Sequence, residues 1–184
     1  GSLTLDFAGK SSALIIGKNG AGKSTIRHAL AVFQRICRGS SRVDKLVSPS
    51  DFTLHANRPM RLEIEVILTG KLFNYAVSFD WPPNFREARI LDEKLSVDGQ
   101  DIFTRQLAQI QVSGGASFGL DWHVFALPVI NEKPPERAIQ SLKSYFASLV
   151  LFAPCPENMT GFSDQPSTKL AHDASNYASF LRGR

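Results

Sequence analysis

Cysteine, histidine and long hydrophobic runs are scarce in this sequence, and each scarcity excludes a class of protein. The 184 residues include two cysteines and four histidines, which are scattered as Cys37, Cys155, His28, His55, His123 and His172. Because none of these spacings suits a metal site or a disulfide framework, we expect two reduced thiols in a cytoplasmic protein. No apolar run approaches transmembrane length and no signal peptide is present, so we expect no membrane partner.

Composition and charge indicate a folded domain. Hydrophobic residues make up 43% of the chain and charged residues 21%, which suits a protein with a buried core. The net charge of +4 is compatible with a nucleic-acid partner without requiring one. We therefore expect residues 1–184 to form a single domain. Because the chain starts with Gly1-Ser2 in place of Met and ends just after a helical stretch, we expect it to be one lobe of a longer protein.

The most informative segment is a glycine-rich loop that fits every fixed position of the phosphate-binding pattern G-x-x-x-x-G-K-[ST]. It consists of Gly17, Lys18, Asn19, Gly20, Ala21, Gly22, Lys23, Ser24 and Thr25. The apolar run at 13–16 predicts a short buried strand leading into the loop. After the loop, Ile26, Leu30 and Phe33 recur at helical spacing. A strand, a glycine loop and a helix in this order are the context that the motif requires.

The residue types in this loop suit the binding of ATP and Mg²⁺. Its glycines let the backbone turn N–H groups toward phosphate oxygens, and the start of the helix adds further donors. We expect Lys23 to contact the β- and γ-phosphates as the catalytic cation, Ser24 to ligate Mg²⁺, and Thr25 to bond the α-phosphate. The alternative is a glycine-rich turn without a ligand, and the completeness of the motif argues against it.

The rest of the chain predicts strands before the loop and an antiparallel layer after its helix. Alternating apolar residues predict strands at 3–7, 62–68, 73–79, 90–97 and 110–112. Turns at Gly70-Lys71 and Asp98-Gly99 predict hairpins at 62–79 and 90–103. Helical spacing predicts helices at 23–38, from 134 to about 149, and within 167–184. An apolar run at 149–152 predicts a buried strand, 114–117 a loop, and 122–127 either a strand or a short helix. Together they predict an α/β phosphate-loop NTPase fold, with a core sheet flanked by helices and an antiparallel β layer.

The densest basic region of the chain begins in the predicted first helix. It comprises Arg27, Arg35, Arg38, Arg42 and Lys45. One interpretation is a surface that contacts the phosphate backbone of DNA. The other, which we favour, is a solvated helix face and loop without a ligand.

A carboxylate in the position that hydrolysis needs is missing from the predicted elements. ATPases of this kind hold Mg²⁺ and orient water with an acidic residue at the end of an apolar strand. Asp80 ends an alternating strand of the antiparallel layer, and Asp92 follows only two apolar residues. The run at 149–152 ends in Ala153-Pro154, without an acid. We therefore expect a chain that binds nucleotide and lacks part of the apparatus for hydrolysis.

Two stretches resemble a known family of ATPases. The loop at 19–25 resembles the phosphate loop of ABC-type ATPase heads, notably the SMC, RecF and OLD-like group. The tail at 170–178 is similar to a D-[GA]-S-N-x-A stretch of bacterial ATPases in this group, defence-system ATPases among them, and reads Leu170, Ala171, His172, Asp173, Ala174, Ser175, Asn176, Tyr177 and Ala178. The resemblance implies the N-terminal lobe of an ABC-type head.

The resemblance also implies partners and further site residues. Such heads sandwich two ATP molecules between two copies, so the implied assembly is a homodimer whose closure gates DNA binding or a partner nuclease. The glutamine loop of the family is matched to Gln165, which would ligate Mg²⁺. Asp173, Ser175 and Asn176 are either functional or cap a helix.

Two other functions stay open at this point. One is a self-contained small phosphotransferase that uses Asp80 or Asp92. The other is a nucleotide-regulated binding module that hydrolyses nothing. Turnover by the chain alone would favour the first, and ATP binding without turnover in any context would favour the second.

Overall fold

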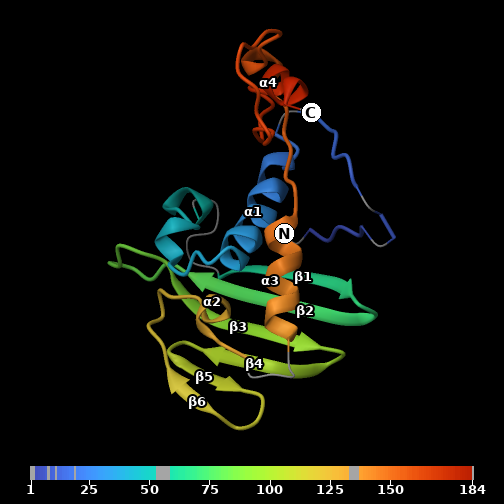
Figure 1. The fold of residues 1–184 in the computed structure, drawn as a ribbon. Coiled ribbons are helices and arrows are strands. Elements are labelled where there is room, and N and C mark those ends of the chain that lie inside the picture. Colours follow the sequence, from blue (N-terminus) through green and yellow to red (C-terminus); the bar gives the residue numbers. More distant parts are fainter. Residues whose placement is uncertain are drawn as a thin grey trace.

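A computed structural model describes residues 3–7, 9–10, 12–18, 20–52, 59–132 and 137–183. Its centre is one six-stranded sheet in which every neighbouring pair of strands is antiparallel. The strands follow one another in chain order across the sheet, and they are β1 (Met60–Leu68), β2 (Lys71–Asp80), β3 (Arg89–Val97), β4 (Gln100–Gln106), β5 (Gln109–Val112) and β6 (Ser117–Gly119). The helices lie on one face of this sheet, except α4 (Tyr177–Arg182), which lies away from it (Figure 1).

Tight turns with left-handed residues determine how the first strands pair. Thr69 and Gly70 between β1 and β2 have φ of 51° and 79°, and Asp98 and Gly99 between β3 and β4 have 50° and 79°. Two successive positive φ values are the signature of the type I′ turn, whose twist matches that of a β-hairpin. The hairpins that alternation predicts at 62–79 and 90–103 are therefore confirmed.

Two long helices cover the apolar face of the sheet, and both lie within the ranges that helical spacing predicts, although the start predicted at 134 lies outside the described residues. They are α1 (Lys23–Cys37) and α3 (Ala138–Ser148), and they pack against each other. Phe33 on α1 packs against both the sheet and the other helix. Its ring centroid lies 5.7 Å from that of Tyr75 on β2 and 6.2 Å from that of Phe146 on α3. The core therefore lies between β2 to β4 and this helix pair.

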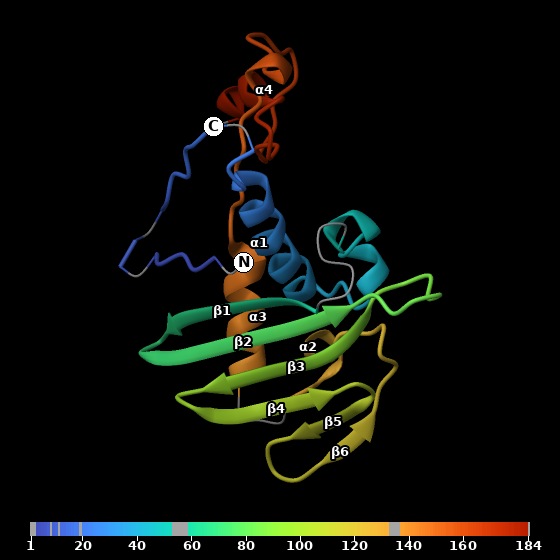
Figure 2. The same ribbon diagram turned by 180° about the vertical axis from the view of Figure 1, so that it is seen from behind.

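Side chains of α1 also hold the chain that leaves α3. Gln34 Nε2 donates to the carbonyl of Leu149, and Arg38 Nη2 donates to that of Ala147 at 2.8 Å. From there the chain runs away from the sheet to the C-terminal segment, which contains α4 (Tyr177–Arg182) (Figures 1 and 2). The short helix α2 (Ala126–Val129) answers the open question at 122–127, which forms a turn followed by this helix.

The predicted parallel core sheet of an α/β phosphate-loop fold, and with it the core of an ABC-type head lobe, is wrong for this structure. Within the described residues, 3–7 and 13–16 form no strand, and neither does 149–152. Leu14 is 87% exposed and Ile16 81% exposed. The physical reason is that hairpins join neighbouring strands at little cost in loop entropy, whereas parallel pairing needs partners from distant parts of the chain. The antiparallel layer formed, and the core sheet did not.

Helical spacing predicts a helix within 167–184, and the structure forms α4 (Tyr177–Arg182) there. One smaller prediction needs correction. The loop predicted at 114–117 ends one residue early, because Ser117 begins β6. Gly183, the residue after α4, lies against the backbone of Ser167, because a Cβ at this position would lie 2.5 Å from the carbonyl oxygen of Ser167.

The two thiols differ sharply in environment, which gives a first testable prediction. Burial in the core raises the pKa of the Cys37 thiol from 9.0 to about 12, whereas Cys155 is half-buried in the C-terminal segment. Because the thiolate is the nucleophile, a maleimide or aromatic disulfide reagent at pH 8 should label Cys155 first and Cys37 orders of magnitude more slowly. A Cys155→Ser variant should then show a labelled thiol only after denaturation. Equal labelling rates for the two thiols in the native protein would contradict this burial.

Candidate functional site

The glycine loop lies at the amino end of α1, which points away from the sheet (Figure 1). Gly20 and Gly22 have φ of 80° and 86°, a conformation that side chains disfavour, so glycine is needed at both positions. The amide of Ala21 donates to the carbonyl of Lys18 at 3.2 Å, which closes a turn inside the loop. Asn19 lies outside the described residues. The sequence pattern therefore correctly identified a tight loop that begins a helix, although no strand leads into it.

The Lys23 side chain folds back over this loop. Its ammonium donates to the carbonyls of Gly17 and Lys18, both at 2.7 Å. A Cβ on Gly17 would lie 3.6 Å from that of Ala21, so the two ends of the loop are close together. An ammonium carries three donors, and two of them are used here. The third is available for an oxygen ligand at the loop.

The first turn of α1 is suited to a negative ligand. It contains no acidic residue, and Gly22 provides no side-chain cap for the helix. The first N–H groups of any α-helix have no acceptor within the helix, and the positive end of its dipole lies there. Ser24 and Thr25 are exposed in this turn, so their hydroxyls are accessible. Lysine, hydroxyls and free backbone donors thus converge where the motif predicts phosphate.

The two carboxylates considered for catalysis belong to the sheet. Asp80 receives Arg89 Nε at 2.8 Å and Nη2 at 3.0 Å, a bidentate ion pair at the end of β2. Asp92 receives Arg61 Nη1 at 3.0 Å. The amino end of α1 points away from this sheet (Figures 1 and 2). The structure therefore does not bring either carboxylate together with the glycine loop.

The predicted glutamine-loop residue is an exposed residue of the C-terminal segment. The backbone N–H of Gln165 donates to Ser163 Oγ at 3.2 Å, and its side chain is not positioned by any contact with the loop at 17–25 among the described residues. Nothing in this geometry makes Gln165 a ligand for a metal ion bound by Ser24.

The Asp-Ala-Ser-Asn stretch of the tail forms a closed network of its own. Asp173 Oδ1 accepts from Ser175 N at 3.1 Å and from Ser175 Oγ at 2.8 Å, which lowers the pKa of this carboxyl. Asn176 Oδ1 accepts from the N–H of Ala171 at 2.7 Å, and its Nδ2 donates to the carbonyl of Lys169 at 2.9 Å. Although Asn176 directly precedes α4, its side chain makes no capping bond to that helix. The helix-cap interpretation is therefore wrong, and these side chains shape the loop before α4.

The basic region around α1 is partly neutralised. Arg38 is committed to the carbonyl of Ala147, and Arg42 Nη2 forms an ion pair with Glu87 at 2.8 Å. Lys45 lies 3.7 Å from Asp44. Arg27 and Arg35 remain exposed on α1. Three of the five basic side chains therefore make contacts within the chain, and Arg27 and Arg35 are the ones left on a solvated helix face.

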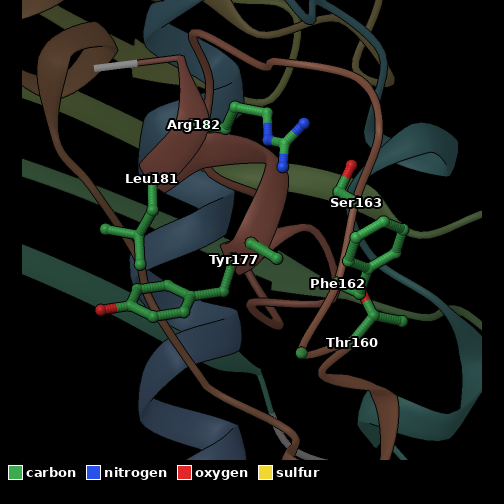
Figure 3. Close-up of a pocket in the computed structure, with 8 residues that line it drawn as sticks. Thr160, Phe162, Ser163, Tyr177, Leu181 and Arg182 are labelled. Atoms are coloured by element: carbon green, nitrogen blue, oxygen red, sulfur yellow. The ribbon is translucent and has the colours of Figure 1, made fainter.

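Sequence reasoning missed a shallow hollow in the C-terminal segment. It has a volume of about 570 Å³ and opens between α4 and the chain before it. Its lining combines aromatic and aliphatic side chains with one guanidinium, and Figure 3 labels Thr160, Phe162, Ser163, Tyr177, Leu181 and Arg182. In that view the Tyr177 ring and the Phe162 ring point to opposite sides, so they do not form a stacking clamp.

No family model, curated protein or solved structure matches this chain. Among the residues that the structure describes, no helix combines the length and apolar character that crossing a bilayer requires. In the same residues, no three histidine, cysteine or acidic side chains gather as a metal site.

Proposed function

We propose that this chain binds ATP with Mg²⁺ through the loop at 17–25 and the first turn of α1. The observation that carries the proposal is the Lys23 ammonium, held at 2.7 Å by two carbonyls of a complete phosphate-loop motif. Around it lie a helix start without an acidic residue and two left-handed glycines. This combination of a cation and backbone N–H donors, with no acidic residue in the first turn, favours a polyphosphate over a neutral ligand.

Each group has a proposed role in the complex. The Lys23 ammonium moves from the loop carbonyls to oxygens of the β- and γ-phosphates, and the backbone N–H groups of the loop surround the β-phosphate. Ser24 Oγ ligates Mg²⁺, whose other ligands are phosphate oxygens and water, because this ion retains several waters when bound. Thr25 Oγ1 bonds the α-phosphate. Asn19 and Ala21 contribute to the loop through their backbone.

Under this proposal, hydrolysis of ATP needs catalytic groups from a partner protein. The carboxylates of Asp80 and Asp92 are paired with arginines on the sheet, so neither supports a self-contained phosphotransferase. ATP-driven pairing of two copies, coupled to DNA binding or to a partner nuclease, has its support in the resemblance of 19–25 and 170–178 to SMC, RecF and OLD-like ATPases. The chain alone should therefore bind ATP and turn it over slowly or not at all.

Calorimetric titration with ATP, ADP and AMP, each with and without Mg²⁺, tests the proposal. We expect ATP and ADP to bind and AMP to bind at least about tenfold more weakly, because AMP lacks the phosphates that charged donors would contact. Equal affinity for ATP and AMP, or no binding of ATP, would contradict it. Phosphate release in the same samples tests hydrolysis, and turnover by the isolated chain with a small acceptor would revive the phosphotransferase alternative.

A further inference from the structure

The sheet ends in a long strand with an unpaired edge. Among the described residues, β1 pairs with β2 alone, over nine residues from Met60 to Leu68. Its outer edge therefore presents a row of N–H and C=O groups that can pair with another strand. Along β1, half-buried residues alternate with exposed ones. The half-buried side chains face the core, and they are Met60, Leu62, Ile64, Val66 and Leu68. An open edge of this length is an uncommon feature in proteins that have no partner for it.

The same chain carries a segment with strand character and no sheet to join. We call residues 3–7 the arm. Leu3, Leu5 and Phe7 alternate with Thr4 and Asp6, and they are 69%, 43% and 39% exposed. The arm belongs to no strand of the described structure. An apolar face of this kind is normally buried once a strand finds a neighbour.

We propose that the arm of a second copy of this chain adds to the outer edge of β1 as an antiparallel strand. One register places every apolar residue of the arm beside an apolar residue of β1, and the pairs are Phe7 with Met60, Leu5 with Leu62, and Leu3 with Ile64. On the open face it places Asp6 beside Arg61 and Thr4 beside Glu63. A slip of one residue would turn the arm's apolar residues to the open face.

Shifts of the arm by an even number of residues also keep its apolar side chains on the core face, and charge distinguishes the proposed register from these. Shifting the arm by two or four residues toward the end of β1 would place Asp6 opposite Glu63 or Glu65, and like charges directly opposite are destabilising. Shifting it two residues the other way would move Asp6 beyond the start of β1 at Met60. The register with Asp6 beside Arg61 is thus the favoured one.

The structure favours a second copy of this chain as the source of the arm that pairs with β1. A single chain contains both the arm and the edge, and within the part of the chain that the structure describes neither of them pairs with a further strand. Two copies that exchange arms satisfy both edges at once, and this reciprocal exchange closes at a two-fold dimer. The exchange involves none of the proposed phosphate contacts, so it does not depend on the proposed function and should occur without nucleotide.

Disulfide trapping tests both the register and the source. In a Cys155→Ser background, a Leu5→Cys chain is mixed with a Leu62→Cys chain and oxidised without nucleotide. We expect a covalent dimer, because directly opposite residues bring their Cβ atoms within disulfide range. The matched control pairs Leu5→Cys with Glu63→Cys, whose side chain lies on the other face, and should give little dimer. Equal yields in the two mixtures would overturn the register.

A chain that carries both Leu5→Cys and Leu62→Cys distinguishes an arm supplied by a second copy from an arm supplied by the same chain. A disulfide within one chain, with no covalent dimer in the sample, would show that the arm pairs with β1 of its own chain, and would overturn the proposed exchange with a second copy. Sedimentation of the unmodified chain provides the second measurement. Leu5→Asp should raise the dimer dissociation constant at least about tenfold, because it buries a charge on the core face, whereas Thr4→Ala should leave it nearly unchanged. A chain that stays monomeric at high concentration would also overturn the proposal.

Discussion

Lys23→Ala is expected to abolish measurable ATP binding while leaving the fold intact. The ammonium is the only side-chain cation that the structure holds against the described part of the glycine loop, at 2.7 Å from two of its carbonyls. Hydrogen bonds to charged groups contribute about 1.5–3 kcal/mol each, so the loss of two or more of them to phosphate should weaken ATP binding by at least about two orders of magnitude, below the range that the titration detects. Titration calorimetry with Mg²⁺–ATP measures the change.

The matched control for this variant is Lys18→Ala. Lys18 belongs to the same loop and has the same charge, but its recorded contact with Lys23 uses the backbone carbonyl, which the substitution retains. We expect Lys18→Ala to weaken ATP binding severalfold at most, through the lost long-range charge. Circular dichroism should show α1 unchanged in both variants. Unchanged ATP affinity in Lys23→Ala would reject the site, whatever Lys18→Ala does.

Glu93→Ala is expected to be the most damaging single substitution for stability. Glu93 lies on β3 with no exposed surface, and its carboxylate accepts from Tyr75 OH at 2.8 Å. It also accepts from the backbone N–H groups of Ala126 at 2.7 Å and Leu127 at 2.9 Å. One carboxylate therefore fastens the start of α2 to the middle of the sheet.

Arg105 is the buried cation that the Glu93 carboxylate neutralises. Its guanidinium on β4 is buried 3.7 Å from the Glu93 carboxylate and donates to the carbonyl of Asp121 at 2.8 Å. Removing the carboxylate would leave this cation, a phenol and two amides without their partner. Breaking one side of a buried ion pair costs about 3–5 kcal/mol, and we expect Glu93→Ala to lower the free energy of unfolding by about that amount.

Urea denaturation followed by fluorescence measures this loss. Glu63→Ala is a suitable control, because Glu63 is exposed on the open face of β1, where removal of a partly solvated ion pair should cost about 1 kcal/mol or less. Glu93→Gln should fall between the two, since it retains hydrogen-bond acceptance from the amides and loses the charge. A similar free energy of unfolding for Glu93→Ala and Glu63→Ala would refute this account of the core.

The local elements could be predicted from the sequence because their signals are local. The 3.6-residue spacing of Ile26, Leu30 and Phe33 predicts α1, and alternation with Asp98-Gly99 predicts a hairpin. The glycine loop was recognisable for the same reason, since Gly20 and Gly22 are needed by its backbone and Lys23 by its chemistry. The buried Glu93 also had a signal that was overlooked, because it shares the core-facing positions of β3 with Leu95 and Val97.

Local patterns in the sequence are enough to predict α1, α3, the hairpin turns and the loop that begins α1, because each depends on residues that are close together in the chain. Which apolar segments enter a sheet depends on contacts between distant parts of the chain. The run at 13–16 and the run at 149–152 have the composition of buried strands, yet both lie outside the sheet. Burial depends on a partner that composition does not specify, and here the antiparallel strands from β1 to β6 pair with one another. The run at 13–16 is left exposed, and the run at 149–152 alternates between half-buried and exposed residues.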